Sequence, residues 1–142
     1  MSLQLGWCED IFHNIHIQKS CFDNLKIIYL SDLHINKSMP LGFLKSLIQK
    51  INNHNADLVL LGGDVLQTKT HRVKEHLALF ALLEAPCYFV SGNHDLWYGA
   101  KELEKILISY GLNSLENKKE LITLKNQTIQ LAGLSDRYSR FY

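Results

Sequence analysis

The sequence has 142 residues, a length that suits one compact domain with its own hydrophobic core and is short for two. Its composition, 46% hydrophobic and 20% charged, is that of a globular protein rather than a disordered chain. Fifteen basic residues against fourteen acidic ones leave a formal charge of +1, which argues against a nucleic-acid partner.

The cysteine content and the hydropathy pattern indicate the compartment. Three cysteines are too few and too scattered for a disulfide framework or a CxxC zinc site, and Cys87 is expected to pack as a small hydrophobe. No window of about 18 apolar residues is available to span a membrane, and no signal-peptide core opens the chain. We therefore expect a reducing, cytoplasmic setting, with peripheral association at a membrane left open.

Apolar runs that end in polar residues recur three times and predict buried strands. They are KIIYLSD at 26–32, DLVLLGGD at 57–64 and CYFVSGNHD at 87–95. IFHNIHI alternates well enough upstream to predict an edge strand, and Asp57 is interpreted as a polar residue that starts its strand. Beyond Gly111 the pattern changes to short β segments, LNSLEN, ELITL and TIQLAGL, the last two joined by a turn at residues 125–127.

Amphipathic helical patterns separate these strands. The pattern over 40–55 predicts a helix with Pro40 in its first turn, and the third helix, over 100–111, is expected to end at Gly111. His71 and His76 are interpreted as solvated residues of the second helical stretch. The expected inward positions are, in order, Leu44, Leu47, Ile48 and Ile51, then Val73, Leu77, Phe80 and Ala81, then Leu103, Ile106, Leu107 and Tyr110.

Strands that alternate with helices predict an α/β domain of βαβ units with a mainly parallel sheet and right-handed crossovers. With no repeat, linker or low-complexity segment, residues 1–142 are expected to form a single domain. The carboxyl ends of parallel strands meet at one edge, where open α/β sheets bind ligands. Three strands end there in the segments Asp32-Leu33-His34, Gly63-Asp64 and Asn93-His94-Asp95.

These residue types suit a divalent metal site. Asp32 and His34 are two residues apart, so an extended backbone would point both side chains the same way, and a carboxylate with an imidazole favours Mn, Fe or Zn. Asp64 follows two glycines that permit a tight turn and close backbone approach, and its two oxygens can bridge two cations. Asn93 adds a neutral carbonyl oxygen. Two metals about 3.5–4 Å apart can clamp a phosphate and hold a hydroxide in line with it.

The remaining candidates surround this metal site. His94 is free to act on the substrate as a general acid, and Asp95 would keep it charged and oriented. Asp95 is equally suited to cap the segment that follows it, and the two roles are compatible. Trp97 and Tyr98 either line a substrate pocket or, as we favour, pack against the sheet edge. Asp136 is expected to lie away from the site.

The blocks D-x-H at 32–34, G-G-D at 62–64 and G-N-H-D at 92–95, in this order, resemble the first three signature blocks of the calcineurin-like metallophosphoesterases. The segments GLNSLEN and IQLAGLSD are similar to the branch that includes phosphodiesterases and hydrolases of the lipid A precursor UDP-2,3-diacylglucosamine. The resemblance implies a four-layer αββα sandwich of two mixed sheets. This chain would supply its first half, βαβαβα and the start of the second sheet.

Position by position, the resemblance implies Asp32, His34 and Asp64 on one metal, and Asp64 with Asn93 on the other. It implies His94 as the residue that contacts phosphate or donates the proton, with Asp95 in support. The family's later G-H and G-H-x-H blocks, which carry three further histidine ligands, do not occur before Tyr142. We therefore expect weak or no activity from this chain alone, as a truncated domain, a split gene product or a degenerate paralogue.

Two classes of function follow. The first is a hydrolase of phosphoesters or pyrophosphates that depends on a divalent metal such as manganese. Its substrate would be a small molecule or a lipid, with a lipid A precursor as one candidate. The alternative is a non-catalytic metal-binding or interaction module that has lost its second metal; a third case is a site completed by another chain. Uncovered sheet edges and apolar faces also predict self-association into a homo-oligomer.

Overall fold

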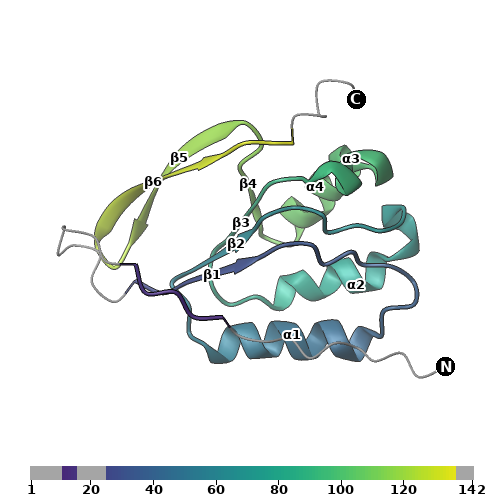
Figure 1. Cartoon of the computed structure of the whole chain (residues 1–142), viewed down its shortest axis with the longest axis horizontal. Coiled ribbons are helices and arrows are strands. Elements are labelled where there is room, and N and C mark those ends of the chain that lie inside the picture. Colours follow the sequence, from purple (N-terminus) through teal and green to yellow (C-terminus); the bar gives the residue numbers. More distant parts are fainter. Residues whose placement is uncertain (1–10, 16–24, 137–142) are drawn as a thin grey trace.

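A four-stranded parallel sheet forms the centre of the protein in a computed structural model that describes residues 11–15 and 25–136 (Figure 1). Its strands lie in the order β1 (Ile27–Leu30), β2 (Leu58–Leu61), β3 (Cys87–Phe89) and β4 (Asn113–Ser114). Every neighbouring pair is parallel. The α/β class and the three strands predicted from the apolar runs are confirmed. Burial is confirmed for β2 and β3 but is wrong for β1, which lies at the edge of the sheet with two of its four side chains exposed.

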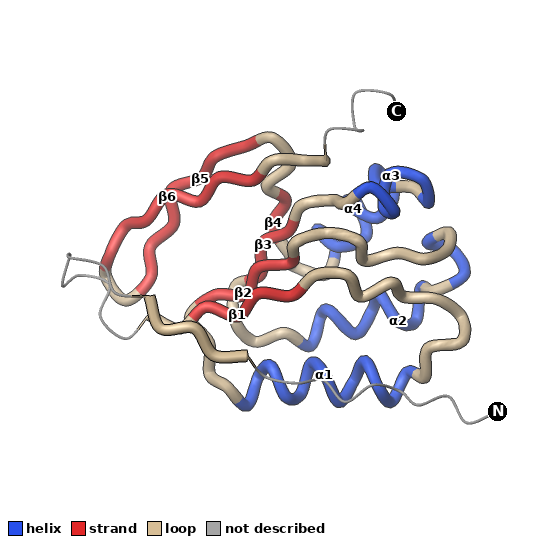
Figure 2. Tube along the Cα trace, in the orientation of Figure 1, coloured by secondary structure: helices blue, strands red, loops and turns tan. Residues whose placement is uncertain are grey.

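Helices α1 (Leu41–Asn53), α2 (Lys74–Ala78) and α4 (Ala100–Ser109) cover one face of this sheet, and the short α3 (Asn93–Tyr98) lies at its carboxyl edge (Figure 2). The four predicted inward residues of α1 are all buried. Helix α4 ends as predicted, because Gly111 adopts a φ of +90° and donates its N–H to the carbonyl of Ile108.

The second amphipathic stretch is less regular than predicted. Two 3₁₀ turns, η2 (Thr70–Arg72) and η3 (Leu79–Leu82), flank α2, so the helical path is broken on both sides. Val73, Leu77 and Phe80 are buried as expected, but Ala81 is exposed. The prediction for Ala81 is wrong because the tighter winding of η3 rotates it away from the core.

A hairpin of β5 (Lys118–Leu124) and β6 (Gln127–Gly133) packs on the opposite face of the sheet, over β2 and β3 (Figures 1 and 2). Its turn holds Lys125 and Asn126 at φ values of +47° and +64°, so it contains two residues rather than the predicted three. Side chains of the sheet divide accordingly: Val59 and Phe89 join the core under the helices, whereas Leu58 and Tyr88 pack with the hairpin. One helical layer, the sheet and the hairpin are thus the observed layers of the expected sandwich.

Strand β1 is the outer strand at one side of the sheet. Its side chains Ile27 and Tyr29 remain 45% and 64% exposed. The predicted edge strand IFHNIHI is not formed in its described part, residues 11–15, which has no regular structure, and its last two residues lie outside the described chain. Among the described residues, no helix combines the length and the apolarity needed to cross a bilayer.

Candidate metal centre

Backbone hydrogen bonds hold the loops after β1 and β2 side by side. The N–H of Asp32 donates to the carbonyl of Gly63 at 3.0 Å, and the N–H of His34 donates to that of Asp64 at 2.9 Å. Ile35 continues the ladder through its N–H to the Val65 carbonyl at 2.7 Å. The parallel register of the strands therefore extends into the loops that carry the predicted ligands.

Three of the predicted metal ligands come together at this edge. One ligand atom from each of Asp32, His34 and Asp64 lies within 4.8 Å of the other two. Nε2 of His34 is 3.8 Å from Oδ1 of Asp32, and the two side chains are 36% and 66% exposed. Two carboxylates and an imidazole, open to solvent on one side, fit a divalent ion such as Mn, Fe or Zn.

All three candidate ligands have a left-handed backbone, with φ of 57° at Asp32, 46° at His34 and 52° at Asp64. The expectation that an extended backbone aligns Asp32 with His34 is therefore wrong, although the two side chains do meet. Such φ values are uncommon outside glycine and persist where the surrounding contacts determine the backbone. The ladder between the two loops provides those contacts.

Two glycines allow the third strand end to approach the second. Gly63 has a φ of +97°, and a Cβ added to it would lie 2.5 Å from the backbone nitrogen of Gly92. A Cβ on Gly92 would collide with the carboxylate of Asp64. The close backbone approach predicted for the G-G-D block is confirmed, and Gly92 of the G-N-H-D block faces it.

The first turn of α3 is attached to this cluster. The backbone N–H of His94 donates to Oδ1 of Asp64 at 3.0 Å, which orients that carboxylate. Asn93, the first residue of α3, is half-buried beside this bond. Its role as a ligand remains a prediction.

The imidazole of His94 lies among aromatic rings. Its centroid is 4.6 Å from that of His34, edge to face, and 4.9 Å from that of Trp97. Tyr98 lies farther away, at 6.3 Å. Within the described chain, Nδ1 of His94 is buried without a hydrogen-bond partner, as is Nδ1 of His34. Trp97, which is 49% exposed, thus packs on the candidate general acid itself.

Asp95 is fully buried behind the site. Its two oxygens accept the backbone N–H groups of Leu66, at 2.8 Å, and Gly92, at 3.0 Å. Burial raises the pKa of this carboxyl, although the N–H groups of Gly92, Leu66 and Val65 oppose that rise. The structure gives Asp95 the capping role, and it ties α3 to the loop after β2; its support of His94 stays a prediction.

Two other sequence-based interpretations concern residues outside the cluster. Asp136 is half-buried and is not a member of the cluster, as expected. His76, interpreted as solvated, is only 8% exposed, and its Nε2 lies 2.7 Å from the carbonyl oxygen of Met39. The helical pattern contained a signal for this, because residue 76 is three positions after Val73 and four before Phe80, both inward.

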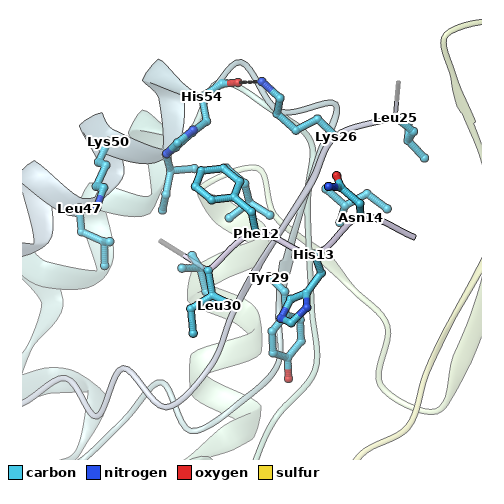
Figure 3. Close-up of a pocket in the computed structure, with 14 residues that line it drawn as sticks. Phe12, His13, Asn14, Leu25, Lys26, Tyr29, Leu30, Leu47, Lys50 and His54 are labelled. Carbon is cyan, nitrogen blue, oxygen red and sulfur yellow. Dashed lines mark hydrogen bonds between the residues drawn. The ribbon is translucent and has the colours of Figure 1, made fainter. Parts of the chain in front are cut away.

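A hollow of about 490 Å³ lies along β1 (Figure 3). It is bounded by β1, α1 and residues 11–14, and its lining includes Phe12, Leu25 and His54. Lys26 closes one side, where its Nζ donates to the His54 carbonyl at 2.7 Å (Figure 3). None of the predicted site residues lines this hollow.

The sequence profile of the calcineurin-like phosphoesterases matches residues 25–137. This chain belongs to that family. The matched span includes all three blocks, from Asp32 to Asp95, and both strands of the hairpin. The family consists of metal-dependent phosphoesterases, and the candidate ligands of this chain are the clustered side chains described above.

Individual relatives agree with this assignment. The chain is 30% identical over 140 residues to the phosphodiesterase YaeI of Escherichia coli, covering 94% of this chain and 52% of YaeI. It is 30% identical over 118 residues to an uncharacterized metallophosphoesterase of Helicobacter pylori, and the match covers 82% of this chain and 31% of that protein. It is 38% identical over 74 residues to the UDP-2,3-diacylglucosamine pyrophosphatase LpxG of Chlamydia trachomatis, and the match covers 50% of this chain and 22% of LpxG. The chain spans about a third to a half of the first two relatives.

Proposed function

We propose that this chain carries the metal-binding portion of a divalent-metal-dependent phosphohydrolase. The observation that supports this most strongly is the convergence of Asp32, His34 and Asp64 to within 4.8 Å at the carboxyl edge of a parallel sheet. A divalent ion held there would supply the positive charge that polarises a phosphoryl oxygen. Membership in the phosphoesterase family supports the same chemistry.

Each side chain then has a defined task. Asp32, His34 and Asp64 hold one ion, and Asn93 adds an oxygen ligand beside Asp64. His94, close to His34 but presented by α3, contacts the phosphate and donates a proton to the leaving oxygen. Asp95 fixes the first turn of α3 through its bonds to backbone N–H groups, and thereby fixes where His94 stands.

For the substrate we propose a phosphodiester or a pyrophosphate, as the names of YaeI and LpxG suggest. A lipid A precursor is the narrower candidate. We propose Mn, Fe or Zn as the metal, one ion for this chain and two for an intact enzyme of which it forms part. Turnover by this chain alone is expected to be weak.

A non-catalytic metal-binding module is the second candidate, because the described residues provide one three-residue cluster, enough for one ion. For either function we also propose self-association into a homo-oligomer and peripheral contact with a membrane. The exposed side chains Ile27 and Tyr29 on the outward face of β1 support both proposals.

Calorimetric titration with Mn²⁺ tests the proposal, and β2 offers a matched pair of variants because Asp57 and Asp64 flank the same strand. Asp64→Asn should abolish binding, whereas Asp57→Asn should leave the affinity unchanged. Inorganic phosphate should then bind the wild-type protein only when Mn²⁺ is present. Metal binding without phosphate binding would favour the module, and no metal binding would contradict both.

A further inference from the structure

His76 is a buried histidine that the proposed chemistry does not use. It lies on α2, is 8% exposed, and faces the loop between β1 and α1. Its Nε2 is 2.7 Å from the carbonyl oxygen of Met39. A carbonyl only accepts hydrogen bonds, so Nε2 carries the proton and donates it. Nδ1 is buried without a partner in the described chain, which leaves the bond to Met39 as the polar attachment of this ring.

The loop that receives this bond continues to the metal cluster. The N–H of Met39 donates to the carbonyl of Asn36 at 3.1 Å. The side-chain amide of Asn36 donates to the carbonyl of His34, also at 3.1 Å, and its Oδ1 accepts the N–H of Ser38 at 2.8 Å. Consecutive hydrogen bonds therefore connect the His76 ring with the backbone of His34.

We propose that His76 is a positioning residue that holds the metal-ligating loop in its binding conformation. His34 must keep a left-handed φ of 46°, while Lys37 and Ser38, farther along the loop, are exposed and receive little packing. A buried donor that fixes the Met39 carbonyl restrains the loop from the helix side, as the β2 ladder restrains it from the sheet side. The inference rests on the proposed metal site and concerns how well that site is preformed.

Groups that orient metal ligands from behind typically change metal affinity by about 10- to 100-fold when they are removed. His76 acts through several bonds, so we expect an effect at the lower end. His76→Leu should weaken Mn²⁺ binding about tenfold by calorimetry. His76→Gln, whose amide N–H can stand in for Nε2–H, should recover most of the affinity.

The control is His71→Leu, because His71 is an exposed histidine in the same connection between β2 and β3. It should bind Mn²⁺ like the wild type. A second route removes the middle of the network instead: Asn36→Ala should lower the affinity in the same direction as His76→Leu. That variant keeps the inference testable if His76→Leu does not fold.

Amide hydrogen exchange of the metal-free protein gives a readout that does not depend on metal. Loss of the hydrogen bond between His76 and the Met39 carbonyl should speed amide exchange at Met39 and Ser38 in His76→Leu. Exchange at these residues should be unchanged in His71→Leu. Wild-type affinity in His76→Leu and Asn36→Ala, or unchanged exchange at Met39, would overturn the inference while leaving the proposed function intact. Failure of the wild type to bind Mn²⁺ would instead refute the proposed function, and the exchange rates would still decide the role of His76.

Discussion

Two aspartates flank strand β2, and their surroundings differ. Asp57, at the amino end, accepts the backbone N–H of Lys26 and pairs with Nζ of Lys125, each at 2.8 Å. Asp64, at the carboxyl end, lies beside Asp32 and His34, and neither carboxylate has a lysine or arginine partner within the described chain. Asp57 is thus paired with a lysine, whereas Asp32 and Asp64 lie together with His34 as a candidate cation site.

The backbone around the two ends differs in the same sense. At the carboxyl end a ladder of N–H···O=C bonds fixes left-handed residues and brings Gly63 against Gly92. Near the amino end an irregular segment, residues 11–14, borders the hollow (Figure 3). The candidate ligands thus lie on backbone that is held by hydrogen bonds and close packing. We therefore expect substitutions at the carboxyl end to lower the free energy of unfolding more than those at the amino end.

Gly63→Ala should have the largest effect on stability. The new Cβ would lie 2.5 Å from the Gly92 nitrogen at a φ of +97°. Steric overpacking typically costs 1–3 kcal/mol and a left-handed alanine adds about 1–2 kcal/mol, so we expect a loss of about 3 kcal/mol or more in urea unfolding. Gly42→Ala, in α1 where nothing lies within 4 Å, should instead stabilise by about 0.5 kcal/mol. Equal effects of both changes would contradict the proposed close packing.

Asp95→Asn should cost about 1–3 kcal/mol, because one of the two backbone N–H groups now bonded by the carboxylate would face an amide NH₂. The pKa of Asp95 is raised in the folded state, so its contribution is fully present below the unfolded pKa and declines as pH rises through the folded pKa. The difference in unfolding free energy between the wild type and Asp95→Asn should therefore shrink as pH increases. Unfolding curves across pH measure this, and a constant deficit would argue against the raised pKa.

Asp57→Asn should cost about 1 kcal/mol, the usual net contribution of such hydrogen bonds. Burial tends to raise the pKa of Asp57, but the bonds from Lys125 and Lys26 outweigh it and the pKa is lowered. Its stabilisation is therefore present above the unfolded pKa and is lost as pH falls through the folded pKa. Asp57→Asn should approach wild-type stability at acidic pH. A stability difference that grows as pH falls would contradict the lowered pKa of Asp57.

Phe12→Ala should have the smallest effect, within about 0.5 kcal/mol, because this ring at the hollow is 77% exposed. Its contact with His54 is a single edge-to-face pair at 6.2 Å. Thermal unfolding of the variant is the check. A loss comparable to that of Asp95→Asn would mean that the amino end is as constrained as the carboxyl end.

The sequence predicted much of this molecule because the relevant signals are local. Apolar runs predicted β1, β2 and β3, although β1 is not buried, and helical periodicity predicted the inward face of α1. The residue types at the strand ends were sufficient to predict the cluster of Asp32, His34 and Asp64. These features depend on short-range pattern and on the rule that parallel strands end at one edge.

What the sequence did not reveal depends on contacts between distant segments. The left-handed backbone of Asp32 and His34 is held by pairing with the loop after β2, and the mild preference of Asp and His for this conformation was too weak to predict it. The burial of His76 requires Met39 to lie over α2. Asp95 accepts backbone N–H groups from both Leu66 and Gly92, which requires the loops after β2 and β3 to meet. The sequence does not show that contact, so it left the capping and catalytic roles of Asp95 open.

The most direct test of the central claim is a crystal structure of the chain grown with Mn²⁺, with anomalous scattering recorded at the manganese edge. We expect one strong peak at the carboxyl edge of the sheet, about 2.0–2.3 Å from oxygens of Asp32 and Asp64 and from a ring nitrogen of His34. No peak there at millimolar Mn²⁺, or three side chains too far apart to share one ion, would contradict it.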